Sequence, residues 1–210
     1  MLRVRGNHNK ERQRMMKGTN GLEWLADRLQ SVATAVPRRF ENRGVSGGEV
    51  IAAVTKPQTR SIVVQTEPFA KDSFFGESGP AELCIWDNFR TQVLSAVSET
   101  VPAFRGTLTR TELEEHMGDS EIFANGTSRP LLSPDDFVAV VRDLISRQPR
   151  GERGILLTNG DANIFHVQPE DGPVVAVRGR WRVGLGGWSL RAYGRDDVRW
   201  LKGHCVFSRG

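Results

Sequence analysis

Residues 173–183 read Pro-Val-Val-Ala-Val-Arg-Gly-Arg-Trp-Arg-Val, and basic and apolar side chains alternate along the second half of this stretch. Successive side chains of a strand point to opposite faces of a sheet, so the alternation predicts a β-strand. Two groups then fall on opposite faces, namely Arg178, Arg180 and Arg182 on one and Val177, Trp181 and Val183 on the other. The stretch predicts a sheet with one arginine-bearing face and one apolar face.

The period of two continues on both sides of this strand. Short apolar runs separated by Gly, Asn and Asp turns predict further strands at 154–158, 162–167, 186–193 and 203–208. Such closely spaced strands favour an antiparallel meander. Pairing between 173–183 and 186–193 would add Ser189, Arg191 and Tyr193 to the arginine-bearing face and Trp188, Leu190 and Ala192 to the apolar one.

Upstream, the period changes from two to that of a helix. Ser133-Pro134-Asp135-Asp136 has a capping serine, a proline in the first turn and two acids near the positive helix end, so a helix is predicted from there to about Gln148. The other elements expected on periodicity are helices over 20–35, 81–101 and 109–117, a hairpin of strands 49–55 and 60–66, and an ordered loop over 67–80.

These elements predict an α+β fold in which about three helices pack on an antiparallel sheet. The chain divides into a basic N-terminal arm over residues 1–18, a mixed region over 19–149 and a β-rich region over 150–210. Sixty residues alone would bury little core, so we expect the last region to complete one sheet with the earlier strands.

Charge is distributed unevenly along the chain. The formal net charge of +4 is made up of +6 over residues 1–45, −6 over 46–149 and +4 over 150–210. Arg far outnumbers Lys, and guanidinium groups suit bidentate contact with phosphate or carboxylate, although genomic base composition also produces arginine-rich proteins. The pattern favours a polyanion partner or self-association of basic on acidic surfaces.

Our leading hypothesis is a non-enzymatic protein that binds a polyanion, with nucleic acid as the first candidate. Arginines suit phosphates and an aromatic ring suits stacking on bases. An ordinary solvent-facing sheet surface also carries arginines, and that reading stays open, as does a solvated tail for the arm. The candidate residues on the strands and in the arm are Arg178, Arg180, Arg182, Arg191, Tyr193, Arg3, Arg5, Arg12 and Arg14.

The alternative hypothesis is a structural assembly subunit. In a virion or another homo-oligomeric component, the basic arm would pack on neighbouring copies of the chain. The sequence therefore predicts that the chain binds nucleic acid, binds a protein partner or associates with itself.

Signatures of catalysis and of cofactors are weak. Cys84 and Cys205 match no metal-ligand spacing, and a Cys205–His204 nucleophile pair has nothing in the sequence to orient it. Glu112 and His116 would lie one turn apart on the helix expected at 109–117, but no third metal ligand accompanies them. We expect neither a cofactor nor a metal.

The chain also lacks an apolar run of membrane-spanning length and an apolar stretch near Met1 typical of a signal peptide. We therefore expect a cytoplasmic or virion-associated protein that is not secreted and has no membrane partner.

Overall fold

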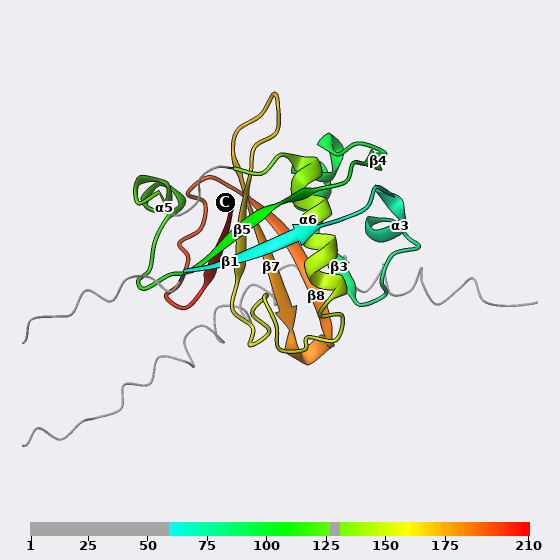
Figure 1. Cartoon of the computed structure of the whole chain (residues 1–210). Helices are drawn as coiled ribbons and strands as arrows, with labels where there is room; N and C mark the ends of the chain where they lie inside the picture. The colour runs from blue at the N-terminus through cyan, green and yellow to red at the C-terminus, as the bar shows by residue number, and fades with distance from the viewer. Residues whose placement is uncertain (1–58, 127–130) are drawn as a thin grey trace, which may run out of the picture. The chain divides into compact units, whose positions relative to one another are not determined.

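The computed structural model of the chain describes residues 59–126 and 131–210, which form a mixed α+β structure on a seven-stranded, mostly antiparallel sheet (Figure 1). In this one sheet the four strands of the β-rich region lie side by side, and strands of the mixed region flank them at both ends. In order across the sheet they are β1 (Thr59–Gln65), β5 (Arg105–Glu112), β9 (Cys205–Arg209), β6 (Asn163–Val167), β7 (Val175–Arg182), β8 (Gly187–Gly194) and β3 (Leu83–Ile85).

The last strand occupies the middle of the sheet. β9 runs antiparallel to β5 and parallel to β6, while β6, β7 and β8 follow one another as antiparallel neighbours. The meander predicted for the C-terminal region is therefore correct for β6 to β8 and wrong for β9. β9 lies between β6 and β5, and in this position it joins the strands of the two regions.

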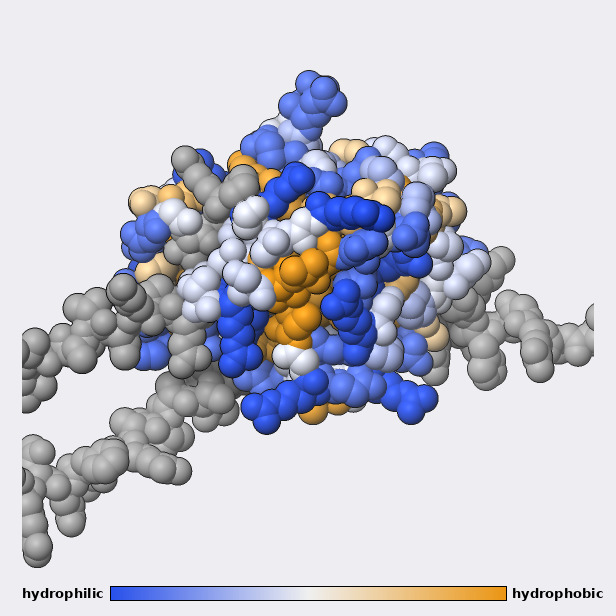
Figure 2. Space-filling view, in the orientation of Figure 1, coloured by the Kyte–Doolittle hydropathy of each residue, from blue (hydrophilic) through white to orange (hydrophobic). Residues whose placement is uncertain are grey.

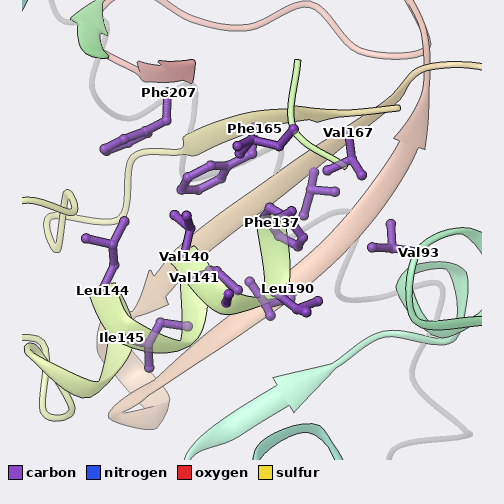
Figure 3. Close-up of a cluster of buried hydrophobic side chains, with 14 of the residues drawn as sticks. Val93, Phe137, Val140, Val141, Leu144, Ile145, Phe165, Val167, Leu190 and Phe207 are labelled. Carbon is purple, nitrogen blue, oxygen red and sulfur yellow. The ribbon is translucent and has the colours of Figure 1, made fainter. Parts of the chain in front are cut away.

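The helix α6 (Pro134–Ser146) covers one face of the sheet, and the residues between that helix and the sheet form the main core (Figure 3). The Ser133 hydroxyl accepts a hydrogen bond from the Asp136 backbone N–H, so the predicted cap is present. Phe137 meets Phe165 of β6 edge-on with ring centroids 5.4 Å apart, and Phe165 stacks on Phe207 of β9 at 4.7 Å.

The remaining short elements surround this framework. β2 (Phe69–Ala70) and β4 (Thr100–Val101) form a separate two-stranded sheet. The described residues contain three further α-helices, α3 (Asp72–Phe75), α4 (Asp87–Gln92) and α5 (Asp119–Ala124), and two 3-10 turns, η1 (Leu94–Ala96) and η2 (Val183–Leu185). With α6 they make four α-helices within this part of the chain, and α6 is the longest of them.

The helix predicted over 81–101 is wrong. Its apolar spacing is helical, yet only Asp87–Gln92 forms an α-helix, and Leu83–Ile85 is a strand parallel to β8. The Trp86 backbone is extended and its N–H donates to the Leu190 carbonyl. The edge of β8 therefore bonds the backbone groups that a helix would have bonded internally.

The helix predicted over 109–117 is also wrong, because Thr109 and Glu112 belong to β5. This strand has ladder partners on both sides, β1 and β9, and those bonds outweigh the local resemblance of Thr109 and Glu112 to a capping box. Glu112 and His116 consequently do not share a helix face.

No strand forms over 154–158. The Gln148 side chain hydrogen-bonds both backbone groups of Leu156. It accepts from the N–H at 2.9 Å and donates to the carbonyl at 3.2 Å. Asn163 does the same for Leu157. Side-chain amides thus replace the ladder that a strand would have needed.

The strand predicted over 60–66 is confirmed as β1, and the loop predicted over 67–80 contains β2 and α3. The partner strand 49–55, the helix 20–35 and the arm 1–18 lie outside the described residues. Of the described helices, none is long and apolar enough to cross a lipid bilayer.

Part of the main core reaches the surface. Figure 2 shows a hydrophobic strip bordered on both sides by hydrophilic side chains. Ile62, Ile155 and Leu157 are only partly buried where they pack against this core.

Candidate anion-binding face

The strands β7 and β8 present arginines on the sheet face opposite α6. On β7 the apolar residues Val177 and Trp181 are buried in the main core, while Arg178, Arg180 and Arg182 alternate with them and stay partly exposed. The predicted alternation is therefore observed on this strand. Val183 departs from it, because it lies in the 3-10 turn η2 and is 67% exposed.

The register between β7 and β8 brings five of the predicted residues onto one face. Arg178 lies directly opposite Arg191, and Tyr193 lies opposite Ala176. Side chains opposite each other share a face, so Arg191 and Tyr193 join the arginines of β7. We call this set, Arg178, Arg180, Arg182, Arg191 and Tyr193, the arginine face.

Aromatic rings lie between these guanidinium groups. The Tyr193 ring centroid is 5.5 Å from the guanidinium carbon of Arg178 and 5.2 Å from that of Arg191. Arg191 also lies 4.8 Å from the Trp86 ring, so cation–π contacts link Trp86, Arg191, Tyr193 and Arg178. The sequence indicated no role for Trp86 here, because its spacing placed it on a buried helix face.

Two hydrogen-bond donors of this cluster lack acceptors. The indole Nε1 of Trp86 and the Nε of Arg191 are buried and have no hydrogen-bond partner among the described residues. A buried donor without an acceptor is costly, and native proteins rarely leave one unmade. Both donors lie under the cation–π contact between Arg191 and Trp86 and are shielded from solvent.

The turn over residues 159–161 borders the arginine face. The Nε of Arg180 donates to the Gly160 carbonyl, and the neighbouring Asp161 carboxylate lies 3.9 Å from Nε2 of His204. Arg180 is thereby held in a fixed direction at the end of β6 and β7.

His204 is a neutral donor beside these arginines. Burial is the main cause that lowers its pKa from 6.5 to about 4; Asp161 opposes the change, and Arg178, Arg180 and His116 add to it. Its Nδ1 accepts from the Leu201 backbone N–H at 3.2 Å, so the neutral ring carries its proton on Nε2. The positive charges of Arg178 and Arg180 therefore contribute to the low pKa of His204.

A buried polar network supports the face from below. Asp119 accepts from His166 Nε2 and from Trp200 Nε1, both at 2.7 Å, and from the Asp196 backbone N–H at 2.9 Å. The Trp200 ring meets Tyr193 edge-on at 5.8 Å. The network therefore fixes a ring against which Tyr193 packs.

The other groups considered for catalysis do not converge. Within the described residues no three His, Cys, Asp or Glu side chains are placed to hold a metal. Cys205 is buried in the main core, on the opposite side of the sheet from the arginine face, and burial raises the pKa of its thiol to about 11. Within the described residues neither Cys84 nor Cys205 forms a disulfide. His116 uses its Nδ1 to accept from the Lys202 N–H.

The other predicted binding residues, Arg3, Arg5, Arg12 and Arg14, lie outside the described residues. The chain matches no protein-family model, no curated protein and no solved structure.

Proposed function

We propose that this protein binds nucleic acid without chemical turnover, and that the arginine face contacts the phosphate backbone. The observation that carries the proposal is the direct juxtaposition of Arg178 and Arg191 across two strands. Two guanidinium groups on one face of the sheet provide several donors and a positive potential, which suit a phosphate group.

The arrangement suits a ligand with repeated charges. Alternate residues of a strand are separated by about 6.8 Å, so Arg178, Arg180 and Arg182 form a row of evenly spaced donors. A phosphate backbone presents charges at regular intervals, whereas a single carboxylate would engage one or two of these groups. Guanidinium planes and the nearby aromatic rings can also stack on bases.

A charge-matched pair of variants tests the proposal. One variant carries R178Q, R180Q and R182Q, and the control carries R60Q, R90Q and R105Q, three exposed arginines from β1, α4 and β5. Fluorescence anisotropy with a labelled oligothymidylate of about 20 nucleotides gives affinity as a function of salt. Thermal unfolding checks that both variants fold.

Removal of three phosphate contacts should lower the slope of log affinity against log salt by about 0.7 for each contact. The control loses the same net charge, so a smaller effect there would locate binding on the arginine face. Equal losses of affinity in the two variants would show that binding depends on net charge alone. Unchanged binding in the β7 variant would refute the proposal.

A further inference from the structure

The turn between β7 and β8 exposes two large apolar side chains at one end of the arginine face. Val183 is 67% exposed and Leu185 is 65% exposed. The other large hydrophobic residues exposed in the described part of the chain, Val63 and Leu201, lie singly on β1 and in a loop. We call Val183–Leu185 the apolar turn.

The shape of the apolar turn is fixed by its backbone. The Gly186 N–H donates to the Arg182 carbonyl at 2.9 Å, and Gly186 takes the left-handed conformation with φ 61°. Around Gly184 no described atom lies within 4 Å of where a Cβ would be. The turn thus presents its two side chains outward from a closed loop with open space around it.

Basic residues lie near the apolar turn. Arg182 precedes it directly, and Gly151 of the segment over 149–154 lies against the Trp181 ring, on the face of β7 opposite the arginines. Arg150 and Arg153 of that segment are exposed. The acids nearby are Glu152, whose carboxylate caps the Arg150 N–H, and Glu82, whose carbonyl abuts Gly187.

We propose that Val183 and Leu185 insert between bases of a nucleic-acid strand whose phosphates lie along the arginine face. This inference rests on the proposed function and specifies its ligand as a strand with accessible or easily unstacked bases. Apolar side chains used as wedges between base steps are an established mode of nucleic-acid contact. Oligothymidylate stacks weakly and therefore suits the mode.

The direction of the arginine row distinguishes this ligand from a lipid bilayer. Arg178 lies four residues behind Arg182 on an extended strand, roughly 13 Å from the base of the turn. Apolar side chains at a membrane surface enter only about 5–10 Å, so a flat bilayer entered by the turn with β7 upright would not reach Arg178. A ligand extended along β7 contacts the turn and the whole row together.

The test compares wild type, V183S/L185S and the matched control V63S. Val63 is an apolar residue of 75% exposure on β1, four strands away from β7 in the sheet order. Anisotropy with the labelled oligothymidylate is measured between about 50 and 200 mM salt. We expect V183S/L185S to bind about tenfold more weakly at every salt concentration with an unchanged salt slope, and V63S to bind as wild type does.

The outcomes separate this inference from the proposed function. Wild-type affinity and slope in V183S/L185S would overturn the wedge and leave phosphate binding intact. Absence of salt-dependent binding by wild type would overturn the proposed function and the wedge with it. Binding of wild type to phosphatidylserine-containing vesicles, lost in V183S/L185S while oligothymidylate binding is retained, would show that the turn enters membranes and would also overturn the wedge.

Discussion

At the scale of single residues, Asp119 is the most constrained charge in the described structure. It is fully buried, and three donors converge on its two carboxylate oxygens. Burial would raise the pKa of Asp119, but the hydrogen bonds from His166, Trp200 and Asp196 outweigh it and hold the pKa below 3.8. The carboxylate joins α5, β6 and the loop that carries Asp196 and Trp200.

Replacement of Asp119 by alanine should therefore destabilise the protein strongly. The substitution leaves Trp200 Nε1 and His166 Nε2 buried without an acceptor, which costs about 3–5 kcal/mol in the free energy of unfolding. Urea denaturation measures the effect. D171A removes an exposed loop carboxylate and should stay within about 0.5 kcal/mol of wild type. A loss below about 1 kcal/mol in D119A would mean that water replaces the carboxylate.

The stability of the protein should also fall in mild acid because of His204. The pKa of this ring is about 4 when folded and 6.5 in its ordinary state, so the unfolded chain binds the proton first. The stabilisation is complete above pH 6.5, is lost as the pH falls towards 4, and amounts to on the order of 3 kcal/mol.

Urea denaturation at several pH values between 7 and 4 checks this dependence on His204. H204N keeps a side-chain acceptor for the Leu201 N–H without an ionisable ring, so its stability should change less than that of wild type. Folded Asp119 does not take up a proton in this comparison of stabilities, because its pKa lies below this pH range. Parallel curves for wild type and H204N would contradict the prediction.

At the scale of elements, the pairing of β7 with β8 places two arginines opposite each other within the proposed binding site. Arg191 faces Arg178 across the pair, and its Nε is buried without a partner among the described residues. R191E should raise the free energy of unfolding by about 0.2–1 kcal/mol, because opposite charges then face each other. The same variant should weaken oligothymidylate binding.

Urea denaturation and anisotropy on the same R191E preparation test both effects. R191Q is the matched control, since it removes the like charge without adding an acid, and its stability should lie between those of wild type and R191E. A loss of stability in R191E of more than about 1 kcal/mol would show that the contact of Arg191 with the Trp86 ring outweighs the repulsion.

Elements whose signals are local were predictable from the sequence. Helix α6 has its own cap and apolar stripe, and the alternation of β7 put its arginines on one face. Elements decided by distant partners were not. Thr109 and Glu112 resemble a helix start, yet their strand is set by β1 and β9, and Gln148 prevents a strand near Leu156.

The candidate site was predictable to the same extent. Alternation and the β7–β8 pairing gave Arg191 and Tyr193, since both follow from the period of two. Trp86 and His204 join the site only through the packing of α4 and the loop before β9, and no local pattern indicates such contacts.

At the scale of the whole molecule, the sheet depends on its last strand. β9 is bonded to β5 on one side and to β6 on the other, so it connects the pair β1–β5 to the strands that carry the arginine face. Cys205, Val206 and Phe207 are almost completely buried. Neither half of the sheet can satisfy its backbone groups at this position without β9.

Deletion of residues 205–210 should consequently abolish cooperative folding of the described region. The deletion removes two ladders and the Phe207 ring that stacks on Phe165, a loss comparable to the 5–15 kcal/mol by which typical domains are stable. Deletion of Gly210 alone removes one hydrogen bond, to the Thr107 carbonyl, and should cost about 1 kcal/mol. Urea denaturation followed by tryptophan fluorescence distinguishes the two, because Trp188 and Trp200 are buried on opposite faces of the sheet. A cooperative transition of wild-type steepness in the shorter chain would mean that β5 and β6 can close the sheet without β9.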